Sequence, residues 1–145
     1  MSMGVIPGTE APGVWPARRT GSDVLLSRML TDISDTETVL NRFDFKSMTV
    51  DGRSGVYAHY LYTTDDTGPN GPAAALIRYE PGACTPPHRH PGYELVYVLD
   101  GELVTDQQRH PQHTLVVMAP NSVHAPHSET GCLLLVVWEQ PVEKL

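Results

Sequence analysis

A chain of 145 residues fits one domain that can bury a core without disulfide bonds. Its net charge of -7, with no cluster of Lys or Arg, argues against nucleic acid as a partner. The N-terminus lacks a basic segment followed by an apolar run, and the longest apolar run, Cys132 to Trp138, is too short to cross a bilayer. We therefore expect a soluble, cytoplasmic protein with no membrane partner.

Gly and Pro recur through residues 1–21, which predicts an irregular N-terminal arm. The arm either packs on the domain or a partner subunit through Val14 and Trp15, or it frays. The apolar residues that follow have helical spacing and predict one short amphipathic helix, capped by Ser22 or Asp23, on the outside of a sheet. These apolar positions are Leu25, Leu26, Met29, Leu30 and Ile33.

From Asn41 onward the pattern is typical of short strands separated by Gly, Pro and Asp turns. The expected strands lie near residues 43–50, 56–62, 73–80, 93–100, 102–105, 114–118 and 132–138. Turns are expected at 51–55 and at Asp100-Gly101, a hairpin signal, with polar loops at 65–72 and 106–113. The pattern predicts an all-β fold, a closed antiparallel barrel or jelly roll.

The strand that begins at Glu94 is apolar on both faces. Glu94, Val96 and Val98 share one face, because alternate residues of a strand point the same way. Residues 133–137 are also apolar on both faces. A small antiparallel barrel normally leaves its outer face polar, so we expect the N-terminal helix or a second subunit to cover the face that carries Leu95.

Two histidines and a carboxylate stand close together in the middle of the chain. His88 and His90 share a face of an extended segment. Pro91-Gly92 allows a tight bend after them, so Glu94 can swing back toward the same point. His124 follows a second, proline-bounded turn and is a fourth candidate. Imidazoles and a carboxylate that converge make a metal site with nitrogen and oxygen ligands.

The cysteines offer no alternative site of this kind. Cys84 and Cys132 form no Cys-x-x-Cys pair, which excludes a zinc site built from thiolates. We interpret both as small buried apolar residues. A disulfide between them is the alternative, and a cytosolic location disfavours it.

The spacing of the candidate ligands resembles a known motif. Gly82, five residues, His88-x-His90, three residues, Glu94, six residues and Gly101 are similar, without a gap, to the first conserved motif of the cupins.

The second cupin motif is matched less closely. His113 and Ser122 stand where its glycines would be, and His124 comes one residue early. This shorter form resembles the cupin domain of the ChrR anti-sigma factors and its relatives, which include dioxygenases that cleave acetylacetone and dihydroxyacetophenone. Tyr93 and Leu95 depart from that subgroup, which tends to have glycine and a second glutamate there.

The resemblance covers about residues 73–138, with similar wording at 79–83, 88–92 and 122–132. It implies a single-domain, RmlC-like cupin barrel over residues 22–145 and a homodimer or higher homo-oligomer formed through a barrel face. His113, in place of a motif glycine, is expected either near the site or only as a residue that tolerates the turn.

The candidate ligands are His88, His90, Glu94 and His124, and they suit one divalent ion. Fe(II), Mn(II), Ni(II), Co(II) and Zn(II) all accept this set, and affinity order alone does not select among them. A cupin that keeps the ligands without holding metal is the alternative. We expect an apolar substrate pocket beside the site, with no separate general base. The expected pocket residues are Tyr60, Tyr62, Ile77, Tyr79, Val96 and Val98, with His127 at the mouth.

The leading hypothesis is a metal-dependent enzyme acting on a small molecule, an Fe(II) dioxygenase that cleaves a diketone or hydroxyketone. The alternatives are a metal-binding or ligand-sensing module without turnover, and a metal-dependent lyase or isomerase. An anti-sigma role is disfavoured, because that activity in the family depends on a separate N-terminal zinc domain, and residues 1–40 contain no His or Cys.

Overall fold

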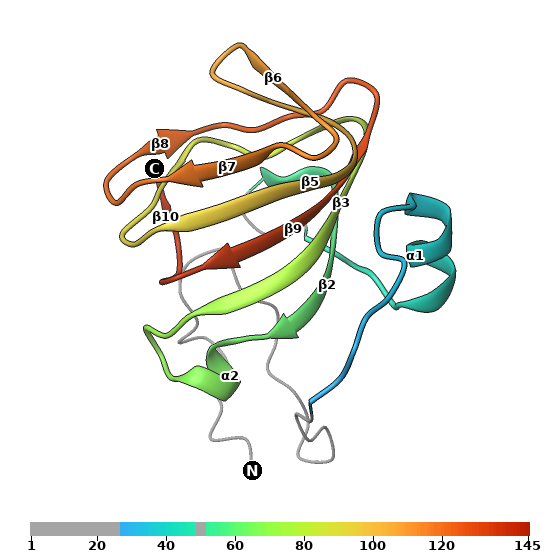
Figure 1. Ribbon diagram of the computed structural model, residues 1–145. Coiled ribbons are helices and arrows are strands. Elements are labelled where there is room, and N and C mark those ends of the chain that lie inside the picture. Colours follow the sequence, from blue (N-terminus) through green and yellow to red (C-terminus); the bar gives the residue numbers. More distant parts are fainter. Residues whose placement is uncertain (1–26, 49–51) are drawn as a thin grey trace.

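The computed structural model describes residues 27–48 and 52–145 as an antiparallel β structure with two short helices (Figure 1). The strands run antiparallel wherever they pair, and this confirms the expected all-β class. The strands are β1 Lys46–Ser47, β2 Ser54–Tyr62, β3 Ala73–Cys84, β4 His88–Arg89, β5 Glu94–Thr105, β6 Gln108–Pro111, β7 Leu115–Met118, β8 Val123–His124, β9 Cys132–Trp138 and β10 Glu143–Lys144. The helices are α1 Thr36–Arg42 and α2 Thr64–Thr67.

The strands form two sheets. The larger has seven strands in the order β1-β2-β3-β9-β5-β6, with β7 also paired to β5, and the smaller has the order β10-β4-β8. Inward-facing residues of the larger sheet form the main core, since alternate side chains of each strand reach the interior. This core includes Val56, Ile77, Tyr79, Val96, Val98, Leu134, Val136 and Trp138.

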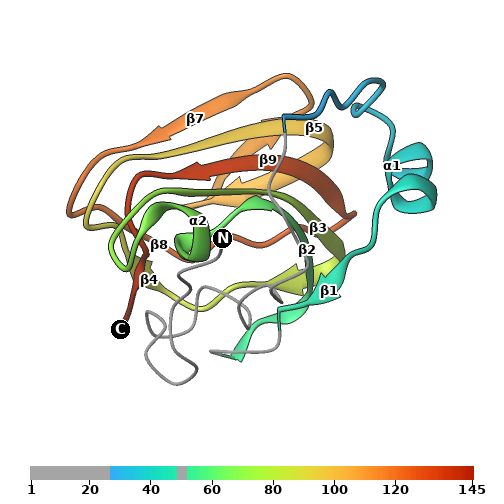
Figure 2. The ribbon, with the colours of Figure 1, turned by 90° about the horizontal axis from the view of Figure 1, so that it is seen from below.

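A second apolar cluster lies on the outer face of the larger sheet. Val39 of α1 is fully buried there against Leu76, Leu99 and Leu133. The two views agree that α1 stands outside the strands (Figures 1 and 2). The N-terminal segment therefore covers part of the outer face of β5. The sequence had predicted that either this segment or a second subunit would do so. Leu95, at the other end of that face, stays 39% exposed.

The helix forms later in the chain than the apolar spacing predicted. Residues 27–33 are not helical, and the part of the prediction that falls on residues 22–26 lies outside the described residues, as does the arm at 1–21. Helix α1 begins after Asp35, whose carboxylate accepts hydrogen bonds from the backbone N–H and hydroxyl of Thr38. An aspartate in this N-cap position satisfies a free N–H group of the first turn.

Leu30 and Ile33 still pack against the outer cluster, from an extended segment instead of a helix. Their spacing therefore reported burial correctly and the local conformation wrongly. Neither α1 nor α2 is long and apolar enough to span a membrane, among the residues that the structure describes.

The hairpin expected at Asp100-Gly101 is absent, because β5 continues through these residues as one strand. Its register against β9 shifts between Val98 and Asp100, which marks a β-bulge. The two-residue turn lies at Asp106-Gln107, where both residues have positive φ, and it joins β5 to β6 inside the expected polar loop. The bulge lets β5 pair with β7 along its first half and with β6 along its second.

Three smaller expectations also need correction. Helix α2 occupies part of the loop expected at 65–72. Cys84 is exposed, so only Cys132 is the buried apolar residue expected, and both thiols are free. The strand expected at 43–50 is reduced to Lys46–Ser47 among its described residues.

Gly101 is the position in the bulge that tolerates no side chain. Its φ is +77°, and a Cβ there would overlap the carbonyl oxygen of Gly131 and lie 2.8 Å from the Cα of Cys132. Gly82 also has a positive φ, +83°, but nothing lies within 4 Å of its Cβ position. The two glycines therefore differ in steric contact and not in backbone conformation.

We expect Gly101→Ala to lower the free energy of unfolding by about 3 kcal/mol, from the positive φ and the overlap together. Gly82→Ala is the matched control and should lower it by about 1 kcal/mol, from the φ alone. Urea denaturation followed by circular dichroism measures both. Equal losses in the two variants would contradict the role given to Gly131.

Candidate metal centre

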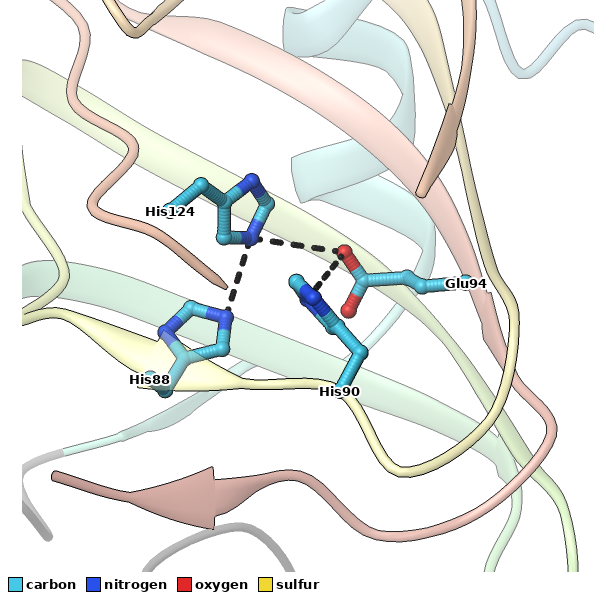
Figure 3. Close-up of side chains that lie close together, drawn as sticks. All are labelled: His88, His90, Glu94 and His124. Atoms are coloured by element: carbon cyan, nitrogen blue, oxygen red, sulfur yellow. Dashed lines mark hydrogen bonds and ion pairs between the residues drawn. The ribbon is translucent and has the colours of Figure 1, made fainter. Parts of the chain in front are cut away.

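The four candidate ligands come from both sheets and meet between them. His88 on β4 pairs directly with His124 on β8 in the small sheet. His90 follows β4 by one residue, and Glu94 is the first residue of β5 in the large sheet. All four side chains point toward one another (Figure 3). The sequence spacing alone had suggested this convergence, and the antiparallel pairing of β4 and β8 accounts for the fourth member.

Backbone hydrogen bonds hold the segment after β4 against the turn before β8. The N–H of His90 donates to the carbonyl oxygen of Ser122 at 3.0 Å, and the N–H of Asn121 donates to the carbonyl oxygen of His90 at 2.7 Å. Asn121 has a φ of +71°, a conformation that asparagine tolerates better than most residues. The shortened second motif thus forms a tight turn that carries His124 back beside His88.

The side-chain atoms of the cluster lie close enough to share one ion. One ligand atom from each residue lies within 4.8 Å of the others. The Nε2 atoms of His88 and His124 are 2.9 Å apart, and Glu94 Oε1 is 3.4 Å from His90 Nε2 and 3.6 Å from His124 Nε2. All four residues are buried, with at most 7% of their surface exposed.

Hydrogen bonds outside the cluster set the tautomer of two histidines. His88 Nδ1 donates to the carbonyl oxygen of Pro86 at 3.0 Å, and His90 Nδ1 donates to that of Ser122 at 3.0 Å. With the proton on Nδ1, each neutral ring presents the bare lone pair of Nε2 to the cluster. His90 Nε2 and His124 Nδ1 are buried and have no hydrogen-bond partner among the described residues. A divalent cation among these nitrogen atoms and the Glu94 carboxylate would bind their lone pairs.

The pKa values of the three histidines in the cluster are shifted in different directions. Burial lowers the pKa of His124 to about 3 and lowers the pKa of His88 below its usual value. Burial acts the same way on His90, but the hydrogen bond and negative charge of Glu94 outweigh it and raise that pKa. Burial would raise the pKa of Glu94, yet the three histidines together lower it. The lowered pKa keeps Glu94 ionised at neutral pH, and His90 is the histidine of the cluster that is most readily protonated when no cation is bound.

A cavity of about 40 Å³ adjoins the cluster inside the main core. Its described lining residues are Met48, Arg53, Val56, Ile77, Tyr79, Thr85, His88, Glu94, Val96, Leu103, His124, Pro126, Leu134, Val136 and Trp138. Apolar side chains form most of the wall, and the hydroxyls of Tyr79 and Thr85 hydrogen-bond each other at 2.6 Å. Besides the candidate ligands, these lining residues include no acid and no histidine.

The cavity includes some of the expected pocket residues and omits others. Ile77, Tyr79 and Val96 line it. Tyr60 instead packs on Trp138, with ring centroids 6.5 Å apart, and Val98 is fully buried farther along the core. Tyr62 and His127 are partly exposed and do not line the cavity.

His127 and His113 lie outside the cluster. His127 exchanges two backbone hydrogen bonds with Val104. His113 has a φ of +74°, the conformation for which the usual motif has glycine, and its Nδ1 lies 3.0 Å from the hydroxyl of Tyr97. His113 therefore occupies the turn and lies apart from the candidate ligands.

Arg53, Thr85 and Trp138 line the cavity without having been singled out in the sequence. For Trp138 a signal existed, because it shares a strand face with Leu134 and Val136. Arg53 follows a turn, where no periodicity indicates the direction of a side chain.

Comparison with known families agrees with this geometry. The model of the ChrR cupin-like domain family matches residues 42–142. The chain belongs to this cupin family. No curated protein sequence matches it. The match extends beyond residues 73–138, where the motifs had suggested the resemblance, and takes in β1, β2 and most of the chain after them.

Solved structures share the cupin fold at low sequence identity. The polyketide cyclase RemF from Streptomyces resistomycificus is 23% identical, over 72% of this cupin and 81% of that chain, with a TM-score of 0.59. A candidate acetylacetone dioxygenase from Methylibium petroleiphilum is 12% identical, over 84% and 85%, with a TM-score of 0.64. The Rhodobacter sphaeroides complex of SigE with the anti-sigma ChrR is 23% identical, over 68% of this cupin and half of that chain, with a TM-score of 0.56. Identities this low show the fold alone.

We expect His90→Ala and Glu94→Gln to weaken Zn(II) binding by more than about 100-fold, since even the loss of residues that support metal ligands costs 10–100-fold. His127→Ala is the matched control, because this histidine lies outside the cluster, and it should bind like the wild type. Metal content after dialysis, together with competition against a chromophoric chelator, measures the effect. Wild-type affinity in His90→Ala would contradict the assignment of the site.

We also expect Zn(II) affinity to rise about tenfold per pH unit below the raised pKa of His90 and to level off above it. The slope is one because only His90 carries a proton there; His88 and His124, with lowered pKa values, are already neutral. Calorimetry in buffers of different ionisation enthalpy counts the protons released. Release of two or three protons per ion would show that His88 or His124 also carries a proton before the metal binds.

Proposed function

We propose that this cupin is a metal-dependent enzyme acting on a small organic molecule, and that its reaction is the oxygen-dependent cleavage of a diketone or hydroxyketone. One observation carries the proposal: three imidazoles and one carboxylate converge, buried, beside a cavity walled by apolar side chains. The fold shared with a candidate acetylacetone dioxygenase, over 84% of the chain, supports the choice of reaction.

The proposed ligands are His88, His90, Glu94 and His124, and the proposed ion is Fe(II), with Zn(II), Mn(II), Ni(II) or Co(II) as alternatives. When bound, such an ion supplies a Lewis acid and a template for two substrate oxygens. Glu94 offsets one of its two positive charges. The site therefore keeps a net charge of about +1, which favours an enolate over a neutral ketone.

The cavity wall positions the substrate and excludes water. Burial raises the pKa of Tyr79, so its hydroxyl stays protonated at neutral pH. Of the two hydrogens carried by the hydroxyls of Tyr79 and Thr85, one joins the pair. The other is free to be donated to a substrate oxygen. Val96, Ile77 and Trp138 supply apolar surface on which the carbon chain of the substrate packs.

A metal-binding module without turnover is the second candidate. The described residues that line the cavity offer no general base apart from the ligands, so without a reactive ion nothing in the wall would perform chemistry. A metal-dependent lyase or isomerase is the third candidate, and it would convert substrate without oxygen.

Other features expected from the sequence remain proposals. We propose a domain that starts at residue 22, a cytoplasmic location and a homodimer or higher homo-oligomer. Leu95, Leu115 and Val117 support the dimer, because β5 and β7 place them together on the outer face, where they are 39%, 56% and 56% exposed. A monomer mass in sedimentation equilibrium would contradict this assembly.

For the main proposal, protein loaded anaerobically with Fe(II) should consume oxygen on addition of acetylacetone or a hydroxyacetophenone. Glu94→Gln should abolish uptake, and His127→Ala should retain it. Tyr79→Phe should slow uptake roughly tenfold, because a hydrogen bond to the substrate is lost.

An oxygen electrode and product chromatography measure the reaction. Bound Fe(II) with no uptake across a broad diketone panel would reject the dioxygenase. A tightly bound, oxygen-inert Zn(II) would favour the module without turnover, and conversion without oxygen would favour the lyase or isomerase.

A further inference from the structure

The side chain of Ser122 contacts a candidate ligand from outside the cluster. Ser122 lies in the turn before β8, where the usual second motif has glycine, and its hydroxyl oxygen is 3.1 Å from His90 Nδ1. Its carbonyl oxygen is 3.0 Å from the same nitrogen. One residue therefore places two oxygen atoms against the ring nitrogen of His90 that does not face Glu94.

The hydroxyl of Ser122 can only accept a hydrogen bond from His90. A hydroxyl carries one hydrogen, and its oxygen lies 2.5 Å from the carbonyl oxygen of Ala119, which has no hydrogen to donate. The hydroxyl hydrogen must therefore point to Ala119, and a lone pair is left for His90 Nδ1. This requires a hydrogen on Nδ1 and leaves Nε2, 3.4 Å from Glu94 Oε1, as the nitrogen that can bind a cation.

These two acceptors also fix the rotation of the His90 ring. A half-turn about the bond between Cβ and Cγ would put a carbon atom where each ring nitrogen now lies. The ring would then lose both bonds to Ser122 and its contact with Glu94. His90 is 1% exposed, so water would not readily replace the lost bonds. The observed rotation is therefore favoured on both sides of the ring.

Among the described residues, no side chain outside the cluster holds the other two histidines in this way. His88 Nδ1 donates to the carbonyl oxygen of Pro86, a main-chain atom two residues earlier. His124 Nδ1 has no hydrogen-bond partner among those residues. Dependence on an outside side chain is therefore specific to His90, and a change of that side chain tests it.

The turn itself does not require the hydroxyl of Ser122. The N–H of Ser122 donates to the carbonyl oxygen of Ala119 at 3.1 Å, and the backbone of His90 bonds to those of Ser122 and Asn121. These bonds use main-chain atoms that every residue except proline supplies. Glycine would form the same bonds and would lack the hydroxyl. A role in the turn alone therefore leaves the contact between the hydroxyl and His90 unexplained.

We propose that Ser122 is a positioning residue for the metal centre: its hydroxyl, held by Ala119, accepts the Nδ1 hydrogen of His90 and keeps Nε2 of that ring directed into the cluster. This inference rests on the proposed metal-dependent function and adds a residue that acts through one ligand. Loss of such a partner typically costs about 10–100-fold in metal affinity. The carbonyl oxygen of Ser122 remains when the hydroxyl is removed, so we expect a loss of about tenfold.

Zn(II) affinity, measured by competition against a chromophoric chelator, tests the energetic part. Ser122→Ala and Ser122→Gly should each weaken binding about tenfold, and Ser122→Thr should restore it, because threonine keeps the hydroxyl. Ser128→Ala is the matched control. Ser128 also donates its hydroxyl to a backbone carbonyl, that of Glu102, so this variant should lower the melting temperature without weakening Zn(II) binding.

Proton NMR of the Co(II)-loaded protein separates positioning from general destabilisation. The paramagnetic ion shifts the ring N–H hydrogens of bound histidines far from all other signals, so each histidine of the cluster should give its own signal. In Ser122→Ala the signal of His90 should move and should exchange with water severalfold faster, because its hydroxyl acceptor is gone. The signals of His88 and His124 should stay unchanged, and Ser122→Thr should give the wild-type spectrum.

Wild-type affinity in Ser122→Ala, an unchanged spectrum, or a change shared by all the histidine signals would each overturn the role of Ser122. Failure of Ser122→Thr to restore affinity would overturn it as well. These outcomes are separable from failure of the proposed reaction. An Fe(II) protein that consumes no oxygen, with the Zn(II) and Co(II) results as expected, would reject the dioxygenase and retain the positioning role. A wild type that binds neither Zn(II) nor Co(II) would reject both.

Discussion

The structure depends on one buried carboxylate. Glu94 is 3% exposed and ionised, and a buried charge is strongly destabilising unless opposite charge or hydrogen-bond donors surround it. Three histidines supply that surrounding: two come from the small sheet, and the third, His90, comes from the segment that joins the sheets. The histidines that compensate the buried charge of Glu94, at the start of β5, therefore link the two sheets of the barrel. A cation at this point would cross-link them and stabilise the folded state by its binding free energy.

The site and the hydrophobic core are built from the same residues. Val96, Leu134 and Trp138 belong to the main core and also line the cavity beside the cluster. Glu94 and Val96 share a strand face, so the register that buries the valine also directs the carboxylate inward. A one-residue slip of β5 would expose both. Fold stability and site geometry are thus coupled through the alternation of one strand. The strands of the small sheet are two residues long, so we expect contacts within the cluster to help stabilise that sheet.

Departures from the sequence-based predictions have local physical causes. Asp100-Gly101 is a strong hairpin signal, but the ladder between β5 and β9 continues through it, and the positive φ of Gly101 serves a bulge instead of a turn. Leu30 and Ile33 have helical spacing and pack in the outer cluster, yet among the described residues of this segment the helix begins after Asp35, which provides its N-cap. In both cases tertiary contacts override a local preference of about 1 kcal/mol.

The sequence by itself determined the fold class and the four residues of the cluster. A two-residue spacing, a Pro-Gly bend and strand alternation are local features, and local geometry decides which side chains share a face. Only the tertiary structure decided what surrounds that cluster. Arg53 and Lys144 lie 91 positions apart in the chain, and neither carries a periodic signal. Both line one cavity together with His88, and Lys144 reaches it because β10 pairs with β4, a long-range pairing that spacing along the chain does not encode.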